Sequence, residues 1–148
     1  MAEKTLGDGS LLRVESVLAT QAIVLQARLM KIVGAAVDRL PVIMSGRGDV
    51  DPAKKIASDA AALAALADIV NKADPVEVAS IIAEVIGYCS IKPKGQTGWQ
   101  KADLDGHFSD RKADIFPTVI FALREIFGDF FSAFPATGIL DRAMASVN

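Results

Sequence analysis

Prolines set the main limit on how this chain can fold, because a proline inside an α-helix removes a backbone donor and clashes with the preceding turn. The six prolines stand at positions 41, 52, 75, 93, 117 and 135. Most of them lie beside glycine, aspartate or a change of composition, which is where turns and helix starts occur. Between them, apolar residues recur mainly at helical spacing. The chain is therefore predicted to fold as a series of helices separated near its prolines.

The first predicted helix spans residues 10–40. Its apolar residues recur at a helical spacing that is broad enough to face more than one neighbour. Ser10 is the predicted N-cap, and Pro41 ends the run. Residues 1–9 have no apolar core and are predicted to be flexible, whereas residues 45–49 have the polar, glycine-rich composition of a surface loop.

Two further helices begin at the same local signal, an aspartate followed by a proline. Asp51-Pro52 opens an alanine-rich helix that is predicted to end near Asn71, and Asp74-Pro75 opens a third helix that ends before Gly87. Aspartate is a favoured N-cap, and proline is preorganised for the first helical position. The apolar stripe of the third helix consists of Val78, Ile81, Ile82, Val85 and Ile86.

The carboxyl-terminal half changes in character. Residues 88–105 are rich in turn formers and basic side chains and are predicted to form a loop or a short hairpin. A fourth helical region covers residues 105–131, where Pro117 divides a short first turn from a long apolar run, and a short helix is expected around residues 139–146. The predicted fold class is all-α: one domain over residues 1–148, built as a small bundle of about four to six helices.

Composition excludes several function classes. Sixteen Lys and Arg against eighteen Asp and Glu give a net charge of −2, which does not favour nucleic-acid binding. One His and one Cys exclude a Cys/His zinc site and a two-histidine metal clamp by counting alone. No metal, cofactor or catalytic site is predicted.

A small enzyme would need His107 or the nearby aspartates to line a pocket. His107 has no recognisable partner for a general base among its neighbours, so its favoured role is to cap or to hydrogen-bond across the start of the fourth helical region. Cys89 follows an apolar run without an adjacent basic activator and is predicted to be a half-buried structural thiol. The protein is therefore predicted not to be an enzyme.

Membrane association is also not predicted. The longest uncharged stretch, residues 16–27, has about half the roughly 20 apolar residues that a membrane span needs. The amino-terminal residues carry an early acidic residue and no apolar core, unlike a secretory signal. The predicted location is the cytoplasm.

Aromatic residues are distributed unevenly. All seven phenylalanines lie between Phe108 and Phe134. The spacing of the last six covers several faces of a helix, so they cannot form one narrow stripe. Two interpretations of the phenylalanine cluster stay open. It belongs either to a helix packed into the core on more than one side or to a surface patch that binds a partner.

The last third of the chain resembles the small tail assembly chaperones that long-tailed bacteriophages encode. The resemblance rests on an ordered set of motifs: Trp99, Asp105-Gly106-His107-Phe108, Phe121-Ala122-Leu123 and Phe127-Gly128-Asp129-Phe130-Phe131. It implies a small helical protein of the host cytoplasm without a cofactor. Such a protein binds the tape measure protein, keeps it soluble while the tail tube assembles and then leaves.

The resemblance also implies partners and contact residues. The partners would be the tape measure protein or other phage tail proteins, and homo-oligomers stay open. The candidate partner-binding residues are Trp99, Phe108, Phe127, Phe130 and Phe131. The alternative is a structural subunit of the phage particle, such as a connector or neck protein, whose apolar surfaces are buried permanently against its neighbours.

Overall fold

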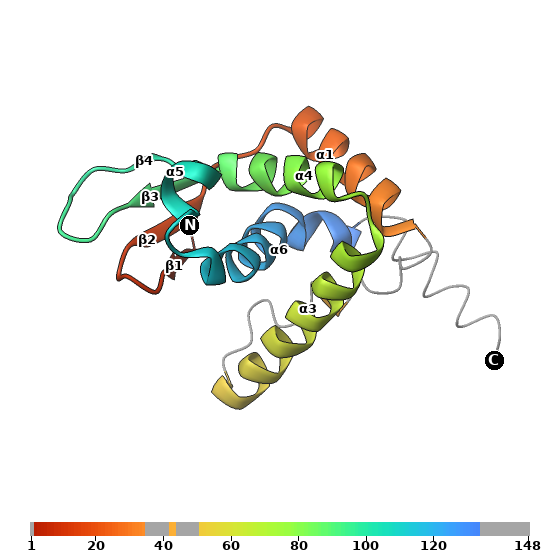
Figure 1. The fold of residues 1–148 in the computed structure, drawn as a ribbon, viewed down its shortest axis with the longest axis horizontal. Coiled ribbons are helices and arrows are strands. Elements are labelled where there is room, and N and C mark those ends of the chain that lie inside the picture. The colour runs from red at the N-terminus through yellow and green to blue at the C-terminus, as the bar shows by residue number, and fades with distance from the viewer. Residues whose placement is uncertain (1, 35–41, 44–50, 134–148) are drawn as a thin grey trace.

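The computed structural model describes residues 2–34, 42–43 and 51–133. Strands and helices both occur, so the fold is mixed α/β (Figure 1). In chain order the elements are β1 (Glu3–Thr5), β2 (Leu11–Val14), α1 (Ala19–Val33), α3 (Pro52–Lys72), α4 (Pro75–Gly87), β3 (Cys89–Lys92), β4 (Gln100–Lys101), α5 (Leu104–Phe108), the 3₁₀ turn η2 (Lys112–Asp114) and α6 (Ile115–Ala133).

The predicted all-α class is wrong, because four strands form an antiparallel sheet in the order β1-β2-β3-β4. The central pair joins β2 to β3, which are far apart in the sequence, with Leu12 opposite Ile91 and Val14 opposite Cys89. The strands have only two to four residues each. Alternation over so few residues is hard to separate from helical spacing.

The amino-terminal prediction changes most. Residues 11–14 form β2, so the first helix begins at Ala19 and not at Ser10. Ser10 lies in the turn between β1 and β2, where its backbone N–H and its Oγ both donate to the carboxylate of Asp8, each at 2.9 Å. Residues 3–5, which were expected to be flexible, form β1.

The β1–β2 hairpin depends on a glycine. Leu6 N–H donates to the Ser10 carbonyl and Gly9 N–H donates to the Leu6 carbonyl, which closes a three-residue loop. Gly9 has a φ of 91°, a left-handed conformation that such loops require and that glycine adopts at little cost. This turn sets the register in which Lys4 lies opposite Leu12.

The two helices with Asp-Pro starts are confirmed. The Asp51 side chain accepts a hydrogen bond from Ala53 N–H, and the Asp74 side chain accepts one from Val76 N–H, each at 3.0 Å. Helix α3 ends at Lys72 and helix α4 ends at Gly87. Local capping chemistry was thus a sufficient signal for both starts.

The carboxyl-terminal region is divided at a different place. Pro117 lies in the first turn of α6, where its missing N–H leaves no helical bond unmade, so it does not interrupt the helix. The region 88–105 contains the β3–β4 hairpin, which agrees with the hairpin alternative. The predicted loop at residues 45–49 and the predicted helix at 139–146 lie outside the described residues.

One face of the sheet is buried against the helices. Leu12 and Val14 of β2 and Cys89 and Ile91 of β3 point into the core, whereas their strand neighbours alternate to the outer face. In Figure 1 the sheet lies at one end of the helices, and α4 runs between α1 and α6. Helix α6 contacts β2, α3 and α4 and forms the centre of the core.

An ion-pair network joins α1 to α4. The Arg28 guanidinium contacts Glu77 at 3.2 Å and Glu84 at 2.9 Å, and the Tyr88 hydroxyl donates to Glu84 at 3.3 Å. Burial and the neighbouring Glu84 carboxylate raise the pKa of Tyr88. The network fixes the position of α1 along α4.

We expect Cys89 to be unreactive in the folded protein. Burial, followed by the charge of Glu15, raises the pKa of its thiol from 9.0 to about 12. At pH 8 the folded chain therefore holds about a thousandfold less thiolate than the unfolded chain. A chromogenic disulfide reagent at pH 8 should react slowly with native protein and rapidly in urea.

The same shift gives a pH dependence of stability. The core accepts the neutral thiol of Cys89 and disfavours its thiolate. The contribution of Cys89 to the free energy of unfolding is therefore full below pH 9 and is lost as the pH rises toward 12. In the reagent test, equally fast reaction of Cys89 in native and in urea-unfolded protein would contradict its buried position.

Candidate protein-binding site

Two of the predicted partner-binding residues belong to the core. Phe108, at the end of α5, and Phe127, on α6, are both 0% exposed. Their side chains pack in the main hydrophobic cluster and present no surface to a partner in this structure. For these two residues, the structure supports the interpretation that the aromatic cluster is part of the core.

Trp99 lies on the outer face of the sheet. Its ring is half-buried, with the Arg13 guanidinium 4.2 Å from the ring centroid and the Lys92 ammonium 5.3 Å from it. Arg13 also pairs with Glu15 at 2.8 Å, and hydrogen bonds from Ser90 and Arg13 lower the pKa of Glu15. The two cations of the same chain thus occupy much of the ring's interaction capacity.

Phe130 and Phe131 lie in the last turns of α6, and their side chains are outside what the structure describes. The three aromatic side chains that the structure describes do not form one patch, because Phe108 and Phe127 are buried in the core and Trp99 lies against Arg13 and Lys92.

His107 has a capping role, as predicted. Its Nδ1 accepts a hydrogen bond from the Asp103 backbone N–H at 2.9 Å, while the Asp103 side chain accepts one from Gly106 N–H at 2.7 Å. These reciprocal bonds fix the start of α5 in the manner of a capping box. Nδ1 of His107 is therefore occupied by a structural hydrogen bond.

Large apolar side chains are exposed on and just before α1 and at separate positions of α3 and α4. Leu18, just before the helix, is 65% exposed, and Ile23 and Val24 are each 55% exposed. The opposite side of the helix carries buried residues, among them Ala22 and Leu25. Helix α1 therefore carries apolar residues on two sides, and the described part of the chain buries one of them.

Sequence reasoning did not single out these residues. A signal was present, because they fall within the uncharged stretch 16–27 and extend the apolar spacing beyond one helical face. The uncovered side was not identifiable without knowing which neighbour α1 packs against.

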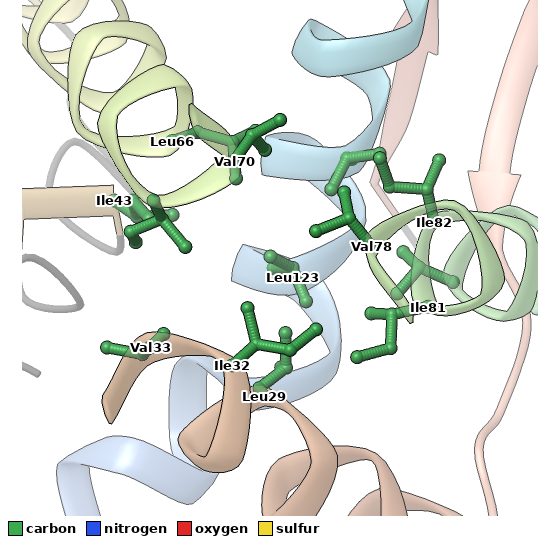
Figure 2. Close-up of a pocket in the computed structure, with 13 residues that line it drawn as sticks. Leu29, Ile32, Val33, Ile43, Leu66, Val70, Val78, Ile81, Ile82 and Leu123 are labelled. Carbon is green, nitrogen blue, oxygen red and sulfur yellow. The ribbon is translucent and has the colours of Figure 1, made fainter. Parts of the chain in front are cut away.

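A small cavity lies between the four long helices, close to the inner side of α1. Figure 2 shows its side chains converging from α1, α3, α4 and α6, with Ile43 closing one side. The cavity has a volume of about 40 Å³, and every lining residue is Val, Leu or Ile. Such a space offers water no hydrogen bonds and is too small for a cofactor, so it provides packing and not chemistry.

Exposed apolar side chains on a helix are a feature of protein-binding surfaces. The chain belongs to the phage tail assembly chaperone protein family, TAC, whose family model matches residues 8–139. The match covers strands β2, β3 and β4 and the described helices, whereas β1 precedes it. No match was found among curated proteins or among solved structures.

Within the described ranges, no helix combines the length and the apolarity needed to cross a membrane.

Replacing Phe127 with alanine should destabilise the fold by about 3–5 kcal/mol, because it removes a fully buried aromatic ring and leaves a cavity. The free energy of unfolding in urea measures this loss. The control is Val76→Ala on the exposed start of α4, which should change stability by about 0.5 kcal/mol or less. A small effect of Phe127→Ala would contradict the core position of this ring.

Proposed function

We propose that this protein binds the tape measure protein and keeps it soluble in the host cytoplasm during tail assembly, without catalysing a reaction. Membership of the tail assembly chaperone family supports the role in assembly. The exposed apolar side of α1 is the observation that carries the binding step. Other phage tail proteins are the alternative clients.

The chemistry of α1 suits a helical client. Ile23 and Val24, neighbouring residues on the exposed side of α1, are uncharged and offer a surface against which an amphipathic helix can lay its apolar face. Each half-exposed aliphatic side chain contributes on the order of 1 kcal/mol when a partner covers it. Contacts of this strength hold a client reversibly, which an assembly factor needs because its client must later be released.

Three of the five predicted aromatic contact residues stay part of this proposal. Trp99, Phe130 and Phe131 are further candidates for client contact, whereas the burial of Phe108 and Phe127 assigns them to the core.

Replacing Ile23 and Val24 together with glutamine should lower the amount of soluble tape measure protein that co-purifies with this chain by about tenfold, because the apolar contact surface is lost. The two proteins are co-expressed, this chain carries the affinity tag, and the soluble client is quantified. Ile56→Gln is the matched control, since Ile56 is also exposed but lies on the protruding start of α3, away from α1 (Figure 1).

Failure of the wild-type chain to hold the tape measure protein would overturn the proposed client. Detection of this chain in purified virions at the level of a structural protein would instead support the particle-subunit alternative. Equal capture by the α1 variant and the Ile56 control would remove α1 as the contact surface.

A further inference from the structure

Strand β1 forms one edge of the sheet, and its backbone has hydrogen-bonding groups that no described residue uses. The turn fixes Leu6 and Ser10 as a hydrogen-bonded pair, so the next such pair is Lys4 with Leu12. The backbone N–H and C=O groups of Glu3 and Thr5 consequently point away from β2. A free edge of this kind can accept a further strand.

A groove runs along this edge. It has a volume of about 330 Å³ and is bounded by β1, α3 and α6. Its apolar lining comes from Leu63 on α3 and from Pro117, Ile120 and Phe121 on α6. The two helices therefore extend past the edge of the sheet, and their apolar surface lies where a fifth strand would cover it.

A buried guanidinium, that of Arg124, forms part of the wall of the groove. Arg124 is 6% exposed; its Nε donates to the Ile43 carbonyl at 2.9 Å, and its Nη1 lies 2.6 Å from the Asp59 carboxylate. Its Nη2 is buried and has no hydrogen-bond partner among the residues that the structure describes. Because Nη2 is buried, it lies behind the groove wall; Arg124 therefore shapes the groove through its bond to Asp59 and offers no donor to a bound chain.

We propose that an extended segment of the client binds in this groove as a strand added to the free edge of β1. The backbone of the segment pairs with Glu3 and Thr5, and its helix-facing side chains contact Phe121 and Leu63. The segment is thus extended in conformation and apolar at alternate positions. This inference rests on the proposed function, because it names the part of the client that is held.

Two other occupants fit the groove less well. A helical segment has no free backbone groups with which to pair with an edge strand. A second copy of this chain would bring its own α3 and α6 beside its β1, and those helices would occupy the space that the groove leaves for the added strand. A single extended segment has neither problem.

Thr5→Pro tests the backbone pairing directly. Proline removes the outward N–H at this position without removing a hydrogen bond to β2, so the hairpin should persist. Thr5→Val is the matched control, because valine keeps the N–H and suits a strand. Each variant is co-expressed with the tape measure protein of the same phage, and its fold is checked by circular dichroism.

We expect Thr5→Pro to lower the co-purified tape measure protein by about tenfold and Thr5→Val to leave it unchanged. Leu63→Glu, which places a charge in the groove, should lower it as well, with Val76→Glu at the exposed start of α4 as its control. Hydrogen exchange of the Thr5 amide in the wild-type complex should slow by about tenfold relative to the free protein.

The inference is overturned if the folded Thr5→Pro variant captures as much tape measure protein as the wild type, or if the Thr5 amide exchanges equally fast in the free and bound protein. If Thr5→Pro does not fold, the inference is tested by the capture of tape measure protein by Leu63→Glu and by the hydrogen exchange of the Thr5 amide in the wild type. Loss of capture by the wild-type chain would instead count against the proposed function and, with it, against this inference.

Discussion

The rest of the structure depends on the burial of α6. From Thr118 to Phe127 this helix is buried or partly buried at every position, so it must be covered on several sides at once. The sheet covers it through β2, and α3 and α4 cover it from other directions. Inside this contact, Arg124 pairs with Asp59 on α3 and donates to the Ile43 carbonyl. A buried guanidinium is tolerated only with such partners, so these bonds fix how α3 lies against α6.

This arrangement explains which predictions from the sequence were correct. The starts of α3 and α4 depend on the local Asp-Pro signals and on bonds to Ala53 and Val76, all within a few residues. The capping role of His107 is equally local. The sheet is different, because β2 becomes a strand through pairing with β3 across the intervening helices. Residues 11–14 taken alone carry too few alternations to separate a strand from the start of a helix.

The candidate site was predictable only in part. Motifs in the last third of the chain indicated the family, which the match over residues 8–139 confirms. The contact residues could not follow from those motifs, because an aromatic residue suits a core as well as it suits an interface. Burial decides between the two for Phe108 and Phe127. The exposed residues of α1 were part of a broad apolar pattern whose uncovered side depends on the packing against α4, which the Arg28 network fixes.

The two proposed contact surfaces lie on different sides of the protein. Helix α4 lies between α1 and α6, so a client helix on the outer side of α1 and an extended client segment beside β1 do not compete for space (Figure 1). Once one surface is occupied, a flexible client presents its next segment to the other at a high effective concentration. Two weak contacts can therefore retain a long client that neither would hold alone. In the proposed arrangement, subunits that cover either client segment during tail assembly would displace one contact at a time, which costs less free energy than breaking both together.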